Sequence, residues 1–310
     1  MLMERGMNKV VIVTRKTRLN DLIYKYNTME QAKFYIEHMG ADFSDYICED
    51  KRYQEAVADV TKVSEKYARV QRIDRDFLPN MIFGANDIVI AVGQDGLVAN
   101  TLKYLNGQPL IGVNPDTVRW DGRLLPFETG EVEQILLKVI SGNYQIREIT
   151  MAQAKTRNGQ IMLAVNDLFV GQKTHVSARY DITWNQRTEY QSSSGIIIST
   201  GLGSTGWYRS VMTQAAGIAE EFGRGNFRCE DMSWDENRLI FVVREPFPSR
   251  STQSGIIYGK LTKTDTFKIL SKMPGNGVVF SDGMESDAIE FNAGTEITIQ
   301  IAPQKGILVV

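Results

Sequence analysis

The stretch "IVIAVGQDGLVANTL", residues 88–102, has the pattern of a buried strand, a tight turn and a helix. Five consecutive apolar residues, 88–92, are typical of a parallel strand that is covered on both faces. The turn that follows holds Gly93, Gln94, Asp95 and Gly96. In open α/β sheets ligands bind at the carboxyl ends of the strands, and the amino end of a helix favours phosphate. The sequence therefore predicts a phosphate-handling turn at Gly93–Gly96.

Asp95 has two interpretations. Asp is common in turns, so it could serve the turn alone. If a nucleotide phosphate lies on the glycines, Asp95 could instead accept the proton of an attacking hydroxyl as a general base. The sequence has no G-x-x-x-x-G-K-[ST] motif, which excludes a P-loop kinase.

The residues before and after this stretch continue a β-α-β rhythm. Strands are expected at 8–14, 86–93 and 108–114, and helices at 18–40, 51–68 and 97–107. The 18–40 segment is expected to form one long helix with Leu19, Leu22, Ile23 and Tyr26 on one face and Gly40 as its stop signal. The alternation predicts a parallel sheet with helices on both faces.

After a helical stretch near 130–142, the pattern changes to strands. They are expected at 144–156, 160–172, 176–185, 195–200, 237–245, 264–272, 275–282, 287–292 and 295–302, interrupted by one helix at 204–222. We therefore predict an α/β domain over residues 1–145 and a β-rich domain over residues 146–310.

Composition limits the classes of partner. A net charge of −2 gives no general attraction to nucleic acid or to an anionic membrane, so small-molecule ligands are expected. Cys48 and Cys229 form no disulfide or zinc pattern, and His38 and His175 cannot make a His-rich metal centre. The apolar run Val10–Val13 is too short for a signal sequence or a membrane span, so we expect a cytoplasmic protein.

A second glycine turn follows the apolar run "GIIIS". Gly201, Gly203 and Gly206 have the G-x-G-x-x-G spacing of a Rossmann turn, but the parallel strand with an acidic residue that should return afterwards is missing. This argues against a hydride-carrier site. Ser204 or Thr205 is expected to cap the helix that follows, and the segment is then either an ordinary capped helix or a ligand-binding helix end.

Five motifs occur along the chain in this order: "VGQDG", "PLIGVN", "AVNDLFVG", "STGLGSTGWYRS" and "VVFSDG". Together they resemble the motif set of NAD kinases, which is a G-G-D-G-T turn, a G-V-N strand, an N-E pair, a T-P-T-G-S-T-A-Y segment and a late Asp-Gly. The chain is most similar to the mitochondrial-type branch, through "TRKTRLNDL", "GVNPDTVRWDGRLLP", "SSSGIIISTGLGSTGW" and "FVVREP". The resemblance covers nearly the whole chain.

The resemblance implies a fold of the NAD kinase/diacylglycerol kinase-like type and a reaction. The γ-phosphoryl group of ATP, with Mg²⁺, would pass to the 2′-hydroxyl of the adenosine ribose of NAD. Asp95 matches the catalytic base, and Gly93, Gln94 and Gly96 match the phosphate-binding turn. A homo-oligomer, either a dimer or a tetramer, is also implied.

Other positions match the family's contacts to the dinucleotide. They are Asn166 and Asp167, with Asp in place of Glu, and Thr205, Gly206, Trp207 and Ser210. For Asn166 and Asp167 an ordinary hairpin turn is the competing interpretation. Lys16 and Arg18, after the first strand with Arg15, could neutralise phosphate at the carboxyl edge that carries Asp95, or could form a solvated basic turn. No residue is expected to bind a metal directly.

The turn departs from the family where phosphate would lie. G-G-D-G-T has become Gly93-Gln94-Asp95-Gly96-Leu97, which adds one side chain and removes a hydroxyl. Three functions therefore stay open. They are an active NAD kinase, a non-catalytic NAD(P)-binding regulatory homologue, and a related kinase for another hydroxyl acceptor such as a lipid or a sugar.

Overall fold

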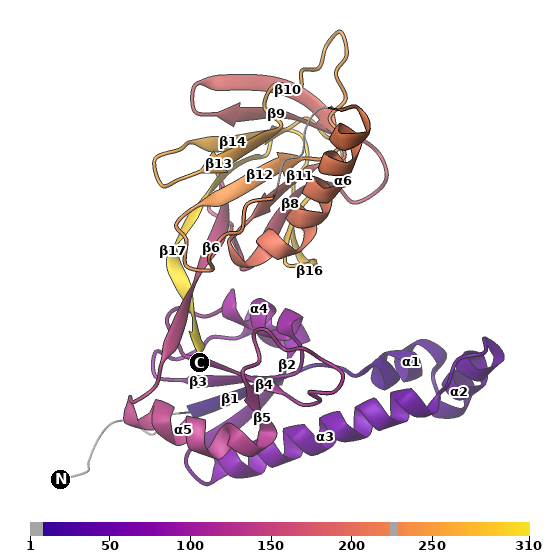
Figure 1. Ribbon diagram of the computed structural model, residues 1–310, viewed down its shortest axis with the longest axis vertical. Helices are drawn as coiled ribbons and strands as arrows, with labels where there is room; N and C mark the ends of the chain where they lie inside the picture. Colours follow the sequence, from indigo (N-terminus) through magenta and orange to yellow (C-terminus); the bar gives the residue numbers. More distant parts are fainter. Residues whose placement is uncertain (1–8, 224–228) are drawn as a thin grey trace. The chain divides into compact units, whose positions relative to one another are not determined.

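The computed structural model describes residues 9–223 and 229–310, which form two compact units (Figure 1). The first unit is Met1–Arg147 with Ile307–Val310, and the second is Glu148–Gly306. Asn8, the first residue of the first expected strand, lies outside the described residues. The chain passes between the units along two strands, β6 (Ile146–Thr156) and β17 (Glu296–Val309).

The first unit is an α/β domain. Its strands are β1 (Lys9–Thr14), β2 (Arg69–Asp74), β3 (Ile88–Val92), β4 (Leu110–Asn114) and β5 (Phe127–Glu128). Its α-helices are α1 (Arg18–Tyr26), α2 (Met29–His38), α3 (Ser44–Glu65), α4 (Asp95–Leu102) and α5 (Val132–Ser141), with short 3-10 helices at Arg75–Asn80 and Thr129–Glu131.

The sheet of this unit has the order β2-β1-β3-β4 with every pair parallel, and β5 also pairs parallel with β4. Val10–Val13 and Ile88–Val92 are fully buried, as runs without polar alternation require in a sheet covered on both faces. Helices α3 and α5 cover one face, and α4 lies on the other (Figure 1). The end of β17 returns here, where Leu308 pairs with Leu110 and Val309 joins the core.

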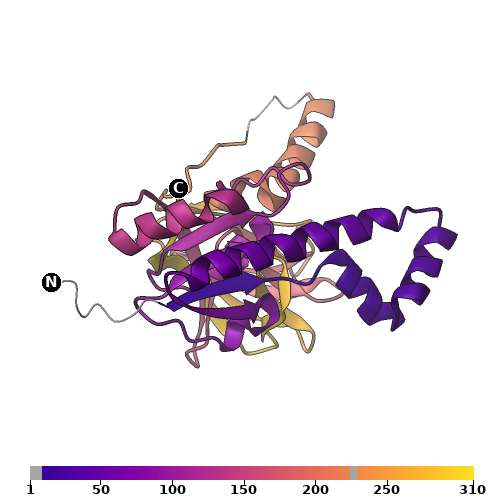
Figure 2. The same ribbon diagram turned by 90° about the horizontal axis from the view of Figure 1, so that it is seen from below.

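The prediction of one long helix over 18–40 is wrong, because this segment forms two helices, α1 and α2. Asn27 adopts a left-handed conformation with φ 68°, which ends α1, and the Thr28 hydroxyl then caps α2 by accepting a hydrogen bond from the Gln31 N–H. The expected apolar face is present, since Leu19, Leu22, Ile23 and Tyr26 pack in one small cluster. Figure 2 shows the two helices beside the amino end of α3.

The second unit is β-rich. Besides β6 and β17, its strands are β7 (Ile161–Ala164), β8 (Asp167–Gln172), β9 (Ala178–Trp184), β10 (Arg187–Ser193), β11 (Ile196–Ser199), β12 (Leu239–Val243), β13 (Tyr258–Leu261), β14 (Phe267–Ser271), β15 (Gly277–Ser281) and β16 (Met284–Glu290). A 3-10 helix (Leu202–Thr205) leads into α6 (Trp207–Glu221).

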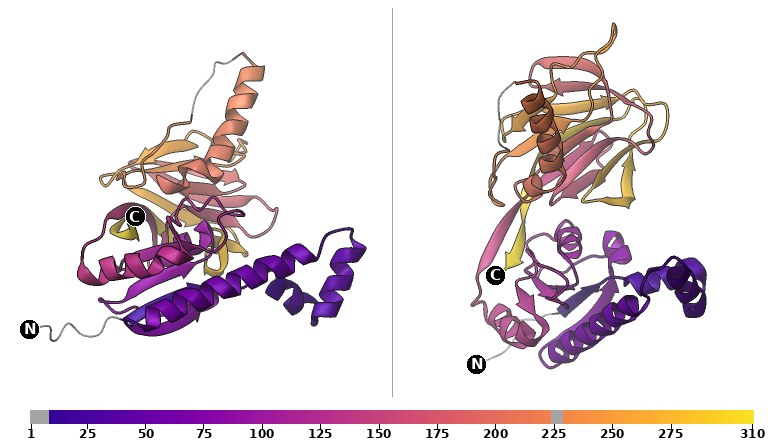
Figure 3. Two further views of the ribbon diagram at one scale, coloured as in Figure 1. Left: turned by 60° about the horizontal axis from the view of Figure 1, so that its bottom comes forward. Right: turned by 45° about the vertical axis from the view of Figure 1, so that its right-hand side comes forward.

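Two sheets pack face to face in this unit. One holds β10-β9-β14-β17 with β6 and β7, and the other has the order β13-β12-β11-β8-β15-β16, with every pair antiparallel in the second sheet. Along β8, Leu168 and Val170 point into the shared core whereas Phe169 points to the opposite face, where α6 packs. Figure 3 shows α6 lying along this second sheet. The predicted α/β domain followed by a β-rich domain is confirmed.

Over residues 9–223 and 229–310, no helix has the length and apolar character that a membrane crossing needs.

Candidate functional site

The first candidate site lies in the first unit, where the strand order reverses. From β1 the chain moves outward to β2 on one side and then to β3 and β4 on the other, so β1 and β3 flank the switch point. Ligands of open α/β sheets bind outside the carboxyl ends of such strands. Thr14 ends β1 and Val92 ends β3, which places Arg15 and Gly93 together at this edge.

Asp95 begins α4 and is half-buried. Its carboxylate accepts hydrogen bonds from the backbone N–H of Leu124 (2.8 Å) and of Arg123 (3.2 Å), and so ties the loop after β4 to the turn. A carboxylate offers about four lone-pair sites. Asp95 therefore has an anchoring role, and it keeps acceptor capacity for a further donor.

The turn is closed by a leucine rather than by a hydroxyl. A Cβ on Gly93 would lie 2.9 Å from Leu97 Cδ2, and Leu97 itself is buried. The backbone N–H of Leu97 donates to the Gln94 carbonyl oxygen (2.8 Å), while the Gln94 side chain makes no capping hydrogen bond to the helix. Gly96 is exposed, and a Cβ there would meet open space. The Leu97 side chain thus occupies the space beside Gly93.

Tyr53 of α3 joins the ends of β1 and β3. Its hydroxyl accepts from the backbone N–H of Arg15 (2.8 Å) and donates to the Val92 carbonyl oxygen (3.0 Å). Burial raises the pKa of Tyr53 to about 12, so the phenol keeps the proton that it donates. Sequence reasoning missed this residue, because nothing local to α3 distinguishes it from a core tyrosine.

The basic residues after β1 are paired with carboxylates. Arg15 pairs with the buried Glu49 at 3.1 Å, and Arg18 pairs with Glu49 and, at 2.7 Å, with Asp45. Lys16 pairs with Asp76 at 2.8 Å, and both side chains are about half exposed (54% and 51%). Their predicted phosphate-binding role stays a prediction, and phosphate would have to compete with these partners.

The second candidate site is a cavity of about 350 Å³ in the second unit. It is lined by residues from three separate segments of the chain: Asn166, Asp167, Leu202, Gly203, Thr205, Gly206, Trp207, Asp282 and Gly283. Five of the six positions that we matched to dinucleotide contacts therefore line one cavity. The sixth, Ser210, lies outside it and lines a neighbouring groove.

The alternative of a hairpin turn at Asn166–Asp167 is wrong. β7 pairs with β6, whereas β8 pairs with β11 and β15, so these residues lie where the chain changes sheets. Asp282 holds them in place, since its carboxylate accepts from the backbone N–H groups of Val165 (3.0 Å), Asn166 (2.6 Å) and Asp167 (3.3 Å). Asp282 adopts φ 53° and Gly283 φ 71°, as in a tight hairpin between β15 and β16.

Asp167 is buried, with 9% of its surface exposed. Burial, and then the charge of Asp282, raise the pKa of the Asp167 carboxyl to about 7. Near neutral pH this group is therefore partly protonated, and it can donate a hydrogen bond as well as accept one. A perturbed carboxyl inside a cavity is a common feature of ligand-binding sites.

Close backbone contacts explain two of the spaced glycines. A Cβ on Gly201 would lie 1.9 Å from the Ser233 carbonyl oxygen, and one on Gly203 would lie 2.0 Å from the Asn166 carbonyl oxygen. The expected cap is wrong, because α6 begins after Gly206 and has no side-chain cap. The Ser204 hydroxyl instead donates to the Gly201 carbonyl oxygen at 2.7 Å.

The wall of the cavity is aromatic at Trp207. Its ring stacks on Phe169 at a centroid distance of 5.4 Å, and the Arg244 guanidinium lies 5.2 Å from the Trp207 centroid. Asp282 also lines the cavity and was not among the predicted site residues, although it belongs to the motif "VVFSDG". That motif was the available signal for this residue.

Among residues 9–223 and 229–310, no three His, Cys, Asp or Glu side chains cluster as they would around a protein-held metal ion.

Comparisons with known proteins find relatives that are named NAD kinases. An NAD kinase from Picrophilus torridus is 26% identical over 202 residues, which cover 63% of this chain and 73% of that protein. An NAD kinase from Chlorobium phaeobacteroides is 30% identical over 135 residues, which cover 40% of this chain and 45% of that protein. The chain is therefore similar in sequence to NAD kinases over part of its length. No family model matches the chain.

Solved structures of that family share the fold. The NAD kinase from Archaeoglobus fulgidus in complex with ATP aligns with 97% of this chain and 93% of its own, with a TM-score of 0.58 and 16% identity. Yeast NADH kinase complexed with NADH aligns with 99% of this chain and 84% of its own, with a TM-score of 0.59 and 14% identity. The mitochondrial-type branch and the divergent turn stay predictions.

Proposed function

We propose that this protein is an NAD kinase, which transfers the γ-phosphoryl group of ATP to the 2′-hydroxyl of the adenosine ribose of NAD and so forms NADP. The observation that carries the proposal is the shared cavity. Asn166, Asp167, Thr205, Gly206 and Trp207 come from two distant segments, yet they line one space. The similar proteins are named NAD kinases and share this fold, which supports the same class of reaction.

The second unit would bind the dinucleotide. A ring of the ligand would lie against Trp207, and the Asn166 amide and the partly protonated Asp167 carboxyl would bind its polar groups. Ser210 lies one helical turn beyond Trp207 in the adjoining groove, and it would contact the ligand only if the ligand extends past the indole.

The first unit would bind the donor phosphates and carry the base. The backbone at Gly93, Gln94 and Gly96 would hold phosphate at the amino end of α4, and Asp95 would accept the proton of the attacking hydroxyl. Lys16 and Arg18 would add positive charge to the extent that phosphate displaces their carboxylate partners.

Mg²⁺ would come with ATP, bound to its phosphates. Mg²⁺ in phosphoryl-transfer sites keeps several water ligands and binds through the substrate phosphates, so the ion needs no ligand from the Asp95 carboxylate that is assigned as the base. When bound, the ion would neutralise charge on the transferred group.

The deciding experiment is a direct assay. Purified protein with Mg²⁺, ATP and NAD is expected to form NADP, and Asp95→Asn is expected to lower the rate by about 10²–10⁴-fold. Polyphosphate in place of ATP tests the donor. Absence of NADP with both donors would exclude the kinase.

The Leu97 side chain beside Gly93 favours a second candidate, a non-catalytic dinucleotide-binding protein. Calorimetry would distinguish the two functions. Tight binding of NAD or NADP without turnover supports the binding protein, and turnover restored in Gln94→Gly/Leu97→Thr would identify the turn as the cause.

We further propose a dimer or tetramer for the protein in solution. Sedimentation equilibrium of the full chain tests this, and a monomer at all concentrations would exclude it.

A further inference from the structure

A groove of about 500 Å³ runs between α6 and the β12–β13 edge of the second unit. Its walls are mainly aliphatic, with Val211, Met212, Ala215, Ile218, Val242 and Ile257 among the lining residues. The volume is in the range of ligand-binding pockets. The aliphatic walls suit an apolar molecule rather than water. Of the residues that line this groove, only Trp207 and Ser210 belong to the sequence positions that match dinucleotide contacts.

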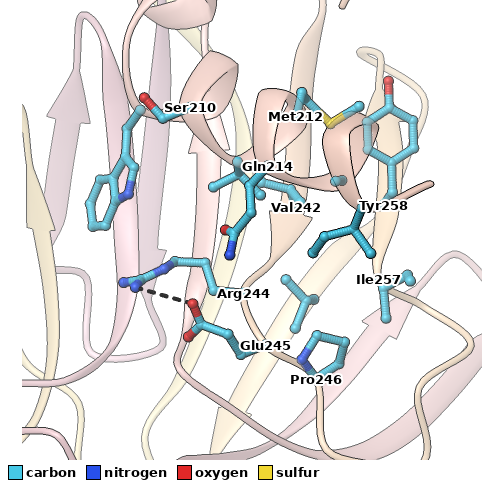
Figure 4. A pocket seen from close by; sticks show the side chains of 14 residues that line it. Ser210, Met212, Gln214, Val242, Arg244, Glu245, Pro246, Ile257 and Tyr258 are labelled. Atoms are coloured by element: carbon cyan, nitrogen blue, oxygen red, sulfur yellow. Dashed lines mark ion pairs between the residues drawn. The ribbon is translucent and has the colours of Figure 1, made fainter. Parts of the chain in front are cut away.

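The groove has one polar end. Figure 4 shows Gln214, Arg244 and Glu245 together at one end, and Met212, Ile257 and Tyr258 at the other. The Arg244 guanidinium is about one-third exposed (29%) and pairs with the adjacent Glu245 at 3.6 Å, longer than a normal hydrogen bond. The space thus combines a long apolar body with a single cation whose partner is held loosely.

The polar corner is held in an unusual conformation. Glu245 adopts φ 43°, a left-handed conformation that is unfavourable for a non-glycine residue. Arg244, the residue before Glu245, has its backbone fixed by two hydrogen bonds. Its N–H donates to the Gly195 carbonyl oxygen (2.8 Å), and its carbonyl oxygen accepts from the Ser194 N–H (2.9 Å). The corner presents the Arg244 head to the groove and leaves the Glu245 side chain 56% exposed at the rim.

The groove and the Asp167 cavity share one residue, Trp207. Its ring stacks on Phe169 of β8, at a centroid distance of 5.4 Å, and lies 5.2 Å from the guanidinium of Arg244, which lines the groove. A ligand that engages Arg244 therefore changes the surroundings of the indole that lines the Asp167 cavity.

We propose that this groove is a binding site for a single-chain amphipathic carboxylate, with the aliphatic chain along α6 and the carboxylate on Arg244 in place of Glu245, and that occupancy is sensed by Trp207. The charge of Arg244 selects an anionic head, and the aliphatic walls select a flexible chain over a polar ring. Binding in the groove does not require the proposed kinase reaction, although the groove shares Trp207 with the proposed dinucleotide cavity.

Three probes of equal chain length test the head group. Decanoate is expected to bind the full chain about tenfold more tightly than decanol or decyltrimethylammonium in calorimetry, because only the carboxylate gains the charged hydrogen bond to Arg244. Equal affinity for all three probes, or no binding of decanoate, overturns the proposal.

Two adjacent substitutions should act in opposite directions. Arg244→Gln is expected to weaken decanoate binding about tenfold, whereas Glu245→Gln strengthens it several-fold by removing the competing carboxylate.

Ala215→Trp, which fills the groove from an exposed position, should abolish binding. Arg209→Gln is the matched control, since Arg209 is exposed on α6 and does not line the groove. Loss of affinity in Arg209→Gln equal to that in Arg244→Gln overturns the proposal.

Tryptophan emission reports the link to Trp207. Decanoate should change the emission of the wild type, and Trp207→Phe, which leaves Trp120, Trp184 and Trp234, should remove that change without abolishing binding. An emission change that persists in Trp207→Phe excludes Trp207 as the sensor. Circular dichroism of each variant confirms that it is folded.

Discussion

The two glycine turns of this molecule, Gly93–Leu97 in the first unit and Gly201–Trp207 in the second, look alike in sequence but are built differently. In the second turn, backbone carbonyl oxygens lie where the Cβ atoms of Gly201 and Gly203 would be. In the first, the nearest atom to a Cβ on Gly93 belongs to the flexible end of Leu97, and Gly96 faces open space. The structure therefore requires glycine only at the positions where backbone atoms occupy the space that a Cβ would need.

The largest effect is expected at Gly203. A Cβ 2.0 Å from the Asn166 carbonyl oxygen cannot be accommodated without moving backbone, so Gly203→Ala should lower the free energy of unfolding by about 4 kcal/mol. Gly96→Ala is the matched control and should leave stability unchanged or raise it slightly, because it sits in open space within a helix. Urea denaturation measures both, and equal losses would remove the distinction between the turns.

The next effect depends on pH. The folded-state pKa of Asp167, about 7, lies above the ordinary value of 3.8, so the folded state retains a proton that the unfolded state loses between these values. The stabilisation that this proton provides is therefore present at low pH and is lost as pH rises to about 7. Asp167→Asn, which stays neutral, should exceed the wild type in stability by about 4 kcal/mol at pH 8 and by little at pH 4.

Urea midpoints across this pH range check the Asp167 prediction. Asp59→Asn, at an exposed position on α3, serves as the control and should change the free energy of unfolding by about 0.5 kcal/mol or less. A constant offset for Asp167→Asn would contradict the raised pKa.

A smaller loss is expected at Leu97. Leu97→Thr removes buried methyl groups from beside Gly93 and buries a hydroxyl, which should cost about 2 kcal/mol of unfolding free energy. Leu137→Thr, at a position on α5 that is 43% exposed, should cost well under half of that. If Leu97→Thr is as stable as the wild type, then Leu97 does not close the turn by packing.

The smallest expected change in stability is at Asp95. Asp95→Asn keeps one side-chain oxygen for the Leu124 N–H and loses the charge, so about 1 kcal/mol of stability should be lost. Amide hydrogen exchange at Leu124 should accelerate accordingly. A loss of several kcal/mol would indicate that the residue is chiefly an anchor, and a rate effect in the assay would then be ambiguous.

Sequence reasoning found the elements that carry a strong apolar pattern. Val10–Val13 and Ile88–Val92 are buried runs, and β8, β11 and β12 show apolar residues at successive positions. It missed β2, an edge strand whose residues are mostly polar and none of which is buried, and β10, whose buried residues include Gln191 and Ser193. Polar strands give no such signal, because long-range pairing rather than local pattern fixes them.

The candidate site was predictable in its residues but not in its construction. The ordered motifs indicated Asn166, Asp167 and Thr205–Trp207, which the structure brings together. The sheet change at Asn166 and the carboxylate of Asp282 that supports it depend on contacts between residues more than a hundred positions apart. Local sequence contains no information on such a contact, and the break between α1 and α2 at Asn27 shows the same limit at short range.

The return of β17 to the first unit has a consequence for biosynthesis. Val309 is buried in the core of the first unit, and Leu308 pairs with β4 of that unit. In the sequence, however, the whole second unit separates these two residues from β1–β5. Domains usually begin to fold as they leave the ribosome, amino-terminal part first. Here part of β4 stays uncovered in the nascent first unit until β17 has been translated, so completion of the first unit depends on prior synthesis of the second unit.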